Sequence, residues 1–92
     1  MRRSADILVI EDEKESSETL GSVLYAAGHN VSLVSSAKEG LKILKDIRCA
    51  VVITELRMPD MSGSELVRTI KNLDPKTSVI VITPYLFINS AI

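Results

Sequence analysis

The chain has few of the residues that carry specialised chemistry. Its 92 residues include one cysteine, one histidine, no tryptophan and 3% aromatic residues. A single cysteine excludes an intrachain disulfide and a cysteine metal cluster. Neither sign of charge dominates, because 11 basic and 12 acidic residues give a net charge of −1. That balance argues against a nucleic-acid-binding surface, which normally shows a basic excess.

Long hydrophobic runs are also absent. The first apolar run, Ile7 to Ile10, is far too short for a signal peptide or a membrane span, so we expect a cytoplasmic protein that does not enter the membrane. Hydrophobic residues make up 46% and charged residues 25% of the chain, which is typical of a globular protein. The length predicts one domain over residues 1–92. Because the aromatic residues are few, Val, Ile, Leu and Ala have to form its core.

Four short runs rich in Val and Ile are typical of strands. They cover residues 6–11, 30–34, 50–54 and 78–83. Most are continuous rather than alternating, as in strands buried on both faces of a parallel sheet. Helical patterns separate these runs, so the sequence predicts an α/β fold with a mostly parallel sheet.

Three segments between the strands have a helical pattern. In the first, four apolar residues at helical spacing predict a stripe that faces the core. They are Leu20, Val23, Leu24 and Ala27. The second and third predicted helices cover residues 37–47 and 64–73, and Ser36 is the predicted N-cap of the second.

Acidic residues follow the predicted first and third strands. In an open parallel sheet, ligands bind beyond the carboxyl ends of the strands. If these two strands are neighbours, Glu11, Asp12 and Glu55 share a shallow cleft with a strand-terminal hydroxyl beside them. Oxygen ligands of this kind suit Mg²⁺. The alternative is that such acids open the next helix, where its dipole favours negative charge, and this is our interpretation of Glu13 and Glu15.

Three stretches resemble the receiver domain of bacterial two-component response regulators. They cover residues 7–13, 51–63 and 79–83, and the run Arg-Met-Pro-x-Met-x-Gly in the second is the most specific. The resemblance spans nearly the whole chain in order and spacing. It implies a flavodoxin-like three-layer sandwich with strand order 2-1-3-4, lacking the last strand and helix of the family. It also implies Mg²⁺-dependent phosphorylation of an aspartate by a histidine kinase.

The resemblance assigns roles to particular residues at the carboxyl end of the sheet. Glu11 and Asp12 match the acidic pair of the family, and Asp12 would contact the metal. Glu55 stands at the phosphoacceptor position and would be a further metal ligand, together with the backbone carbonyl of Arg57.

Three more residues match the family pattern outside the acidic cluster. Thr83 corresponds to the hydroxyl that senses the phosphoryl group, and Pro59 and Gly63 shape the loop after the acceptor.

Glu55 is a departure from the family, because the acceptor there is an aspartate. Its extra methylene moves the carboxylate outward, and an error near 1 Å in an in-line transfer can lower the rate ~10²-fold. We therefore expect little or no phosphorylation at Glu55. Its charge either mimics the phosphorylated state or leaves the site silent, and the sequence does not decide between these two interpretations.

A second departure concerns the end of the sequence at Ile92, where the fourth helix of the family would begin. We expect an incomplete receiver domain, either natural or an N-terminal fragment of a longer transcriptional regulator. Residues 79–82 would then form an apolar edge strand, and such edges invite pairing with another chain. This predicts a homodimer through the fourth strand or the tail over residues 85–92.

The sequence thus favours an atypical receiver domain that acts as a protein-interaction module rather than as an enzyme. Its partner would be a histidine kinase or an output protein. The alternative is a working phosphoacceptor that uses Glu55 or Asp12 with Mg²⁺.

Overall fold

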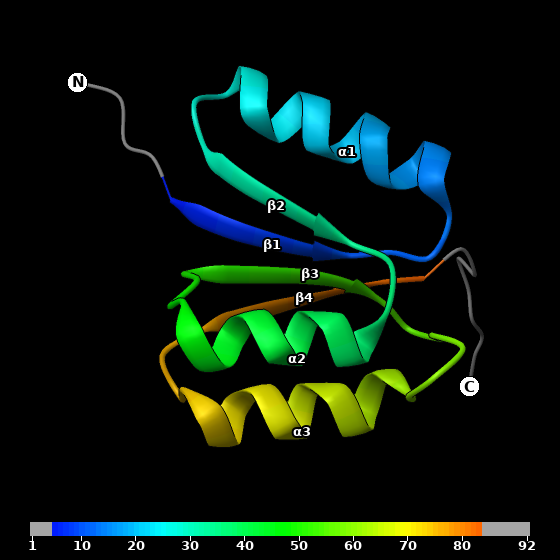
Figure 1. Ribbon diagram of the computed structural model, residues 1–92, viewed down its shortest axis with the longest axis vertical. Helices are drawn as coiled ribbons and strands as arrows, with labels where there is room; N and C mark the ends of the chain where they lie inside the picture. Colours follow the sequence, from blue (N-terminus) through cyan, green and yellow to red (C-terminus); the bar gives the residue numbers. More distant parts are fainter. Residues whose placement is uncertain (1–4, 84–92) are drawn as a thin grey trace, which may run out of the picture.

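The computed structural model describes residues 5–83. Strands and helices alternate along this part of the chain (Figure 1). The strands are β1 (Asp6–Ile10), β2 (Asn30–Val34), β3 (Val51–Glu55) and β4 (Ser78–Ile82). The helices are α1 (Lys14–Ala26), α2 (Ala37–Asp46) and α3 (Gly63–Leu73). Each predicted strand, and each helix whose bounds were predicted, lies within one residue of its expected position. The prediction of a homodimer contact through the tail falls outside the described residues.

The four described strands form one parallel sheet in the order β2-β1-β3-β4. Helix α1 covers one face, and α2 and α3 cover the other (Figure 1). This confirms the flavodoxin-like three-layer arrangement. The strand order reverses beside β1, so the carboxyl ends of β1 and β3 lie next to each other, which is where a ligand site is expected.

The larger core lies between the sheet and the helices α2 and α3. Leu8, Ile10 and Val52 from the sheet are completely buried there. Leu66 and Ile70 meet them from α3, spaced by one helical turn. Burying an aliphatic side chain of this kind contributes about 1.5–3 kcal/mol, so this face carries most of the packing energy.

The smaller core lies under α1, and here the predicted apolar stripe is partly wrong. Leu20 and Leu24 are half-buried, but Val23 is 63% exposed and Ala27 is exposed. The residues of α1 that are buried are Ser17 and Gly21.

Small residues let α1 lie close to the sheet. A Cβ atom added at Gly21 would stand 3.0 Å from a methyl carbon of Leu33 in β2. The close approach therefore fixes which side of α1 meets the sheet, and it turns the side chain of Val23 away from it.

Strand β4 forms one edge of the sheet, and three of its hydrophobic residues are exposed. Ile80, Val81 and Ile82 have exposed fractions of 51%, 38% and 40%. Within residues 5–83, no helix is long and apolar enough to cross a membrane.

Candidate functional site

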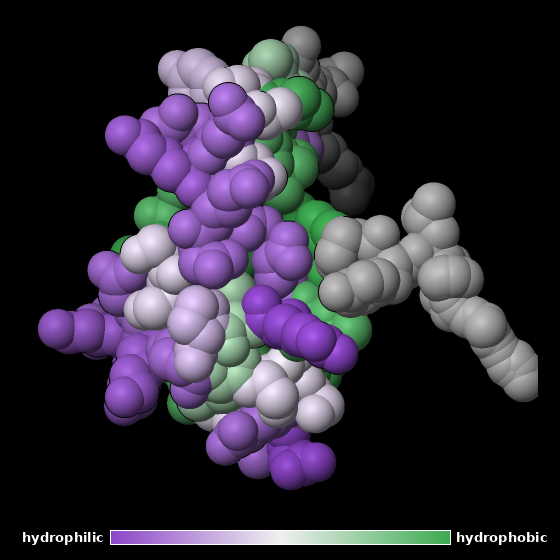
Figure 2. Space-filling model, turned by 90° about the vertical axis from the view of Figure 1, so that its right-hand side faces the viewer, coloured by the Kyte–Doolittle hydropathy of each residue, from purple (hydrophilic) through white to green (hydrophobic). Residues whose placement is uncertain are grey.

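The candidate site lies at the carboxyl end of the sheet. Ile10 of β1 is opposite Thr54 of β3, so the next residues along the two strands, Glu11 and Glu55, stand side by side and half-buried. Figure 2 shows this end of the molecule as a mainly hydrophilic surface bordered along one side by a hydrophobic strip. Asp12 follows Glu11 and is exposed. The structure therefore brings the two strand-terminal acids together, as the sequence predicted.

Crowding of carboxyl groups changes the acidity of Glu11. Partial burial is the main cause that raises the pKa of Glu11 to about 7. The backbone N–H of Glu13 donates a hydrogen bond of 3.0 Å to Glu11 Oε2 and opposes that rise. Hydrogen bonding to Glu55, its negative charge and hydrogen bonding to Asp12 add to the rise. Near neutral pH, the Glu11–Glu55 pair therefore favours a bound proton or a cation.

The acids do not assemble into a metal site with three side-chain ligands. Among residues 5–83, no group of three or more His, Cys, Asp or Glu side chains is arranged to hold a metal ion. The three carboxylates are nonetheless close to one another, because Glu55 and Asp12 both contribute to the raised pKa of Glu11. Mg²⁺ in proteins is commonly bound by one or two carboxylates and keeps several waters, and the facing carboxyls of Glu11 and Glu55 fit that smaller donor set.

Two threonines lie near the carboxyl ends of β3 and β4. Thr54 is buried, and its hydroxyl donates a hydrogen bond of 3.3 Å to the backbone oxygen of Glu55. It therefore belongs to the core side of β3 and does not face the cleft. Thr83 lies just after β4, at the same end of the sheet, and is exposed.

The loop between β3 and α3 is fixed by close backbone contacts. The N–H of Gly63 donates a hydrogen bond of 2.8 Å to the carbonyl oxygen of Leu56, and a Cβ atom at Gly63 would lie 2.5 Å from that oxygen. Only glycine fits there. Arg57 pairs with Ser62 across the loop, Pro59 is exposed, and the buried Met58 anchors the loop in the larger core.

Asp60 is a structural residue of this loop that the sequence analysis missed. Its carboxylate accepts hydrogen bonds from the backbone N–H groups of Ala37 (3.1 Å) and Lys38 (3.0 Å) at the start of α2. These bonds lower the pKa of Asp60, the bond from Lys38 being the largest cause. Asp60 therefore ties the loop after Glu55 to a second helix. No local pattern reveals such a contact between residues far apart in the sequence.

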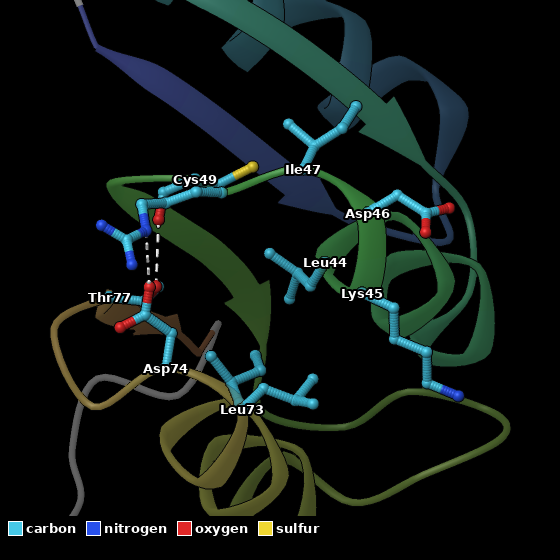
Figure 3. A pocket seen from close by; sticks show the side chains of 10 residues that line it. Leu44, Lys45, Asp46, Ile47, Cys49, Leu73, Asp74 and Thr77 are labelled. Atoms are coloured by element: carbon cyan, nitrogen blue, oxygen red, sulfur yellow. Dashed lines mark hydrogen bonds and ion pairs between the residues drawn. The ribbon is translucent and has the colours of Figure 1, made fainter.

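A second hollow lies at the opposite end of the sheet, between the last turns of α2 and α3 (Figure 3). This cavity of about 220 Å³ is lined by residues that include Leu44 and Leu73. Across it Arg48 and Asp74 form an ion pair of 3.2 Å, and the Thr77 hydroxyl donates to the carbonyl oxygen of Cys49 at 3.0 Å. It contains none of the predicted site residues.

Cys49, which lines that cavity, is buried, and burial raises the pKa of its thiol. It therefore has the character of a packed small apolar residue rather than a reactive thiol.

Solved structures share this architecture. The chemotaxis response regulator CheY4 of Vibrio cholerae has a TM-score of 0.86 and is 23% identical, and the match covers 92% of this chain and 72% of that one. A response regulator receiver domain protein from Clostridium thermocellum has a TM-score of 0.80 and is 38% identical, with 86% and 64% covered. The first match shows a similar fold, and the second shows similarity in both fold and sequence.

Curated relatives have the same domain within longer chains. The transcriptional regulatory protein FixJ of Rhizobium meliloti is 39% identical over 75 residues, which are 82% of this chain and 37% of FixJ. The chain spans between 15% and 37% of the length of such relatives. The family model described as "Response regulator receiver domain" matches residues 7–91. By this match, and by the fold and acidic strand ends described above, the chain belongs to the response regulator receiver domain family of two-component signalling.

Proposed function

We propose that this receiver domain, over residues 1–92, acts as a protein-interaction module in two-component signalling and is not phosphorylated at Glu55. The observation that carries the proposal is Glu55 itself, which ends β3 where the family pattern has its acceptor aspartate. Its carboxyl lies beside that of Glu11, whose pKa it helps to raise. A glutamate side chain is one methylene longer than the aspartate of the family pattern, and small errors in placement slow an in-line phosphoryl transfer severely.

The acidic end of the sheet is also our proposed Mg²⁺ site. The carboxyls of Glu11 and Glu55 would hold the ion, with Asp12 and the backbone carbonyl of Arg57 as further donors. Bound there, Mg²⁺ would neutralise charge that otherwise favours a proton on Glu11. Because two carboxylates supply most of the protein ligands, we expect an ion that keeps several of its waters.

The proposed partners are a histidine kinase or an output protein, and a second copy of the chain. The N–H of Ser78 donates a hydrogen bond to the carbonyl oxygen of Ala50, and the carbonyl oxygen of Ile82 accepts one from the N–H of Leu56. The backbone groups of alternate residues of β4 therefore point toward β3. The backbone groups of Val79 and Val81 therefore point outward from the edge. Strand β4 has no charged residue to discourage pairing, which supports a homodimer built through this edge.

The homodimer is tested by sedimentation at micromolar concentrations. We expect a concentration-dependent dimer, and we expect Val81→Lys to make it monomeric because charged side chains on an edge strand oppose pairing. A monodisperse wild-type monomer would exclude this part of the proposal.

Phosphorylation is tested by incubating the chain with acetyl phosphate and Mg²⁺ and measuring its intact mass. We expect no gain of one phosphoryl group in the wild type. The matched variant Glu55→Asp restores the shorter acceptor and should be labelled. A labelled wild-type chain would show a working phosphoacceptor, and peptide mapping would place it at Glu55 or Asp12. If Glu55→Asp also stays unlabelled, the length of the side chain is not the reason for inactivity.

A further inference from the structure

The outer face of α2 carries a stripe of lysine side chains. Lys38, Lys42 and Lys45 are exposed and stand four and three residues apart, so they lie on one side of the helix. This lysine stripe extends over about 10 Å, or two helical turns. Like charges at such spacing repel one another and weaken a helix, so the stripe does not contribute to the stability of α2.

Acidic residues near the lysine stripe leave it unneutralised. The carboxylate of Glu39 accepts hydrogen bonds from Ser35 and Ser36 in the turn before α2. Asp46 lies at the far end of the helix, and within residues 5–83 no ion pair joins any of the three lysines to an acidic side chain. A partner with negative charge is therefore the one that complements this face.

The lysine stripe leads into the cavity between the last turns of α2 and α3. Lys45 lines that cavity of about 220 Å³, together with Leu44 and Ile70. Ile47 and Leu73 line it as well, and their exposed fractions are 53% and 45% (Figure 3). An apolar cavity of about 150 Å³ accommodates a benzene ring, so this one has room for one large apolar side chain.

The exposure of this surface does not come from the open edge at β4. Helix α2 contacts β1, β2 and α3, and β2 forms the edge of the sheet opposite β4 (Figure 1). A strand or helix beyond β4 would lie at the other side of the sheet. It would leave the outer face of α2 and its junction with α3 open.

Helix α2 is also attached to the candidate site. The carboxylate of Asp60, in the loop after Glu55, accepts hydrogen bonds from the backbone N–H groups of Ala37 and Lys38. These are the first residues of α2, where the lysine stripe begins. A partner on the stripe would therefore contact the helix whose first turn is held by the loop of the site.

We propose that the outer face of α2 binds an acidic amphipathic helix of a partner protein. Its carboxylates lie against the lysine stripe, and one large apolar side chain enters the cavity beside Ile47 and Leu73. A helix is favoured because acids three and four residues apart on it match the spacing of the lysines, as in paired helices. The apolar cavity and the nearby Asp46 favour a protein over a nucleic acid, whose phosphates such a carboxylate repels. The proposal rests on the interaction role proposed above and names the surface that carries it.

The test uses synthetic helical peptides of about 20 residues, or between five and six turns. The acidic peptide has Glu at positions i, i+4 and i+7, with a Phe four residues before the first Glu and another four residues after the last. The control peptide has Gln in place of the three Glu. Binding to the 92-residue chain is measured by fluorescence anisotropy and mapped by amide chemical shifts in NMR.

We expect the acidic peptide to bind, with shifts along α2 and at Leu73. The Gln peptide should bind at least about tenfold more weakly. Raising the salt from about 0.1 M to about 1 M should weaken the acidic peptide, because the screening length falls from ~10 Å to ~3 Å.

Variants of the chain separate the lysine stripe from its overall charge. Lys42→Glu should weaken the acidic peptide about tenfold, because it places a repulsive charge in the middle of the stripe. Lys76→Glu is the matched control, since it changes the net charge equally in an exposed loop between α3 and β4 that does not line the cavity. Leu73→Ser should weaken binding severalfold. Circular dichroism confirms that each variant is folded.

The proposal is overturned by no binding of the acidic peptide, by equal binding of the Gln peptide, or by equal effects of Lys42→Glu and Lys76→Glu. Shifts confined to α1 would overturn it too, as would tighter binding of a short DNA duplex than of the acidic peptide. A wild-type dimer that dissociates in Lys42→Glu would show that a second copy occupies this face instead. The acetyl phosphate experiment uses no peptide, so a failure here is distinguishable from a phosphorylated Glu55.

Discussion

The two faces of the sheet differ in how completely helices cover them. Under α2 and α3, the core cluster has eight buried residues, whereas under α1 it has three. Two helices seal the first face, and one helix placed over β1 and β2 leaves β4 of the second face exposed (Figure 1). Hydrophobic burial is the main stabilising contribution in folding. One face therefore holds most of the buried core of residues 5–83, while the other leaves the apolar side chains of β4 exposed.

The largest effect is expected from removing a side chain at the centre of the sealed face. Leu66 of α3 is completely buried, so Leu66→Ala should lower the free energy of unfolding by about 2–5 kcal/mol. Val23→Ala, on the open face, should change it by no more than about 0.5 kcal/mol because Val23 is 63% exposed. Urea denaturation followed by circular dichroism measures both.

Leu66→Met controls for the size of the cavity, since a swap that keeps the volume lowers stability by less than about 1.5 kcal/mol. Equal decreases in the free energy of unfolding for Leu66→Ala and Val23→Ala would contradict the proposed difference in packing between the two faces.

Two glycines give a matched pair with opposite expected signs. A Cβ atom at Gly40 of α2 would lie 2.4 Å from Cδ1 of Ile10, which is completely buried and has no room to move. Overpacking of this kind lowers stability by about 1–3 kcal/mol. At Gly21 of α1 the nearest atom belongs to Leu33, which is 43% exposed and can yield.

Alanine in place of glycine in a helix stabilises it by roughly 0.5–1 kcal/mol. We therefore expect Gly40→Ala to lower the melting temperature and Gly21→Ala to leave it unchanged or raise it. A destabilised Gly21→Ala would mean that α1 is packed as tightly as α2.

The sequence was sufficient to predict the order and limits of the elements, because periodicity is a local property. It was misleading for α1, where Val23 belongs to a regular apolar stripe and yet is exposed. The face of a helix that meets the sheet depends on close packing as well as on hydrophobicity. Ser17 and Gly21 face the sheet because their small side chains let the helix approach it closely. A search for apolar residues at helical spacing does not detect small residues of this kind.

At the site, the sequence predicted that acids at the ends of β1 and β3 would meet, since parallel neighbours align their carboxyl ends. The structure places β1 beside β3, so Glu11 and Glu55 follow neighbouring strand positions, and Glu55 contributes to the raised pKa of Glu11. The sequence did not predict that Thr54 faces the core, because a strand buried on both faces has no alternation that shows which way each side chain points. Asp60 was missed because it acts on a helix start 22 and 23 residues away.

The helix starts show the same contrast between the two faces on a smaller scale. Ser36 and Ser62 each accept a hydrogen bond from the backbone N–H three residues further on, at the starts of α2 and α3. Asp60 adds two more such bonds at α2. Helix α1 begins after Glu13, whose side chain makes no capping bond. The helices α2 and α3 are thus also the ones whose first backbone N–H groups are capped by side chains.

The smallest effect is expected from this difference in capping, and it depends on pH. The pKa of Asp60 is lower in the folded chain than its ordinary value of 3.8, because the carboxylate accepts hydrogen bonds from Lys38 and Ala37. Its contribution to stability is therefore complete well above pH 3.8 and is lost as the pH falls through the folded pKa. Asp60→Asn should accordingly be less stable than the wild type near neutral pH, and the gap should close in acid. Glu13→Gln, which removes no cap at α1, should show no such pH-dependent gap. Urea titrations at a series of pH values measure both, and a gap for Asp60→Asn that widens in acid would show that Asp60 does not stabilise the start of α2.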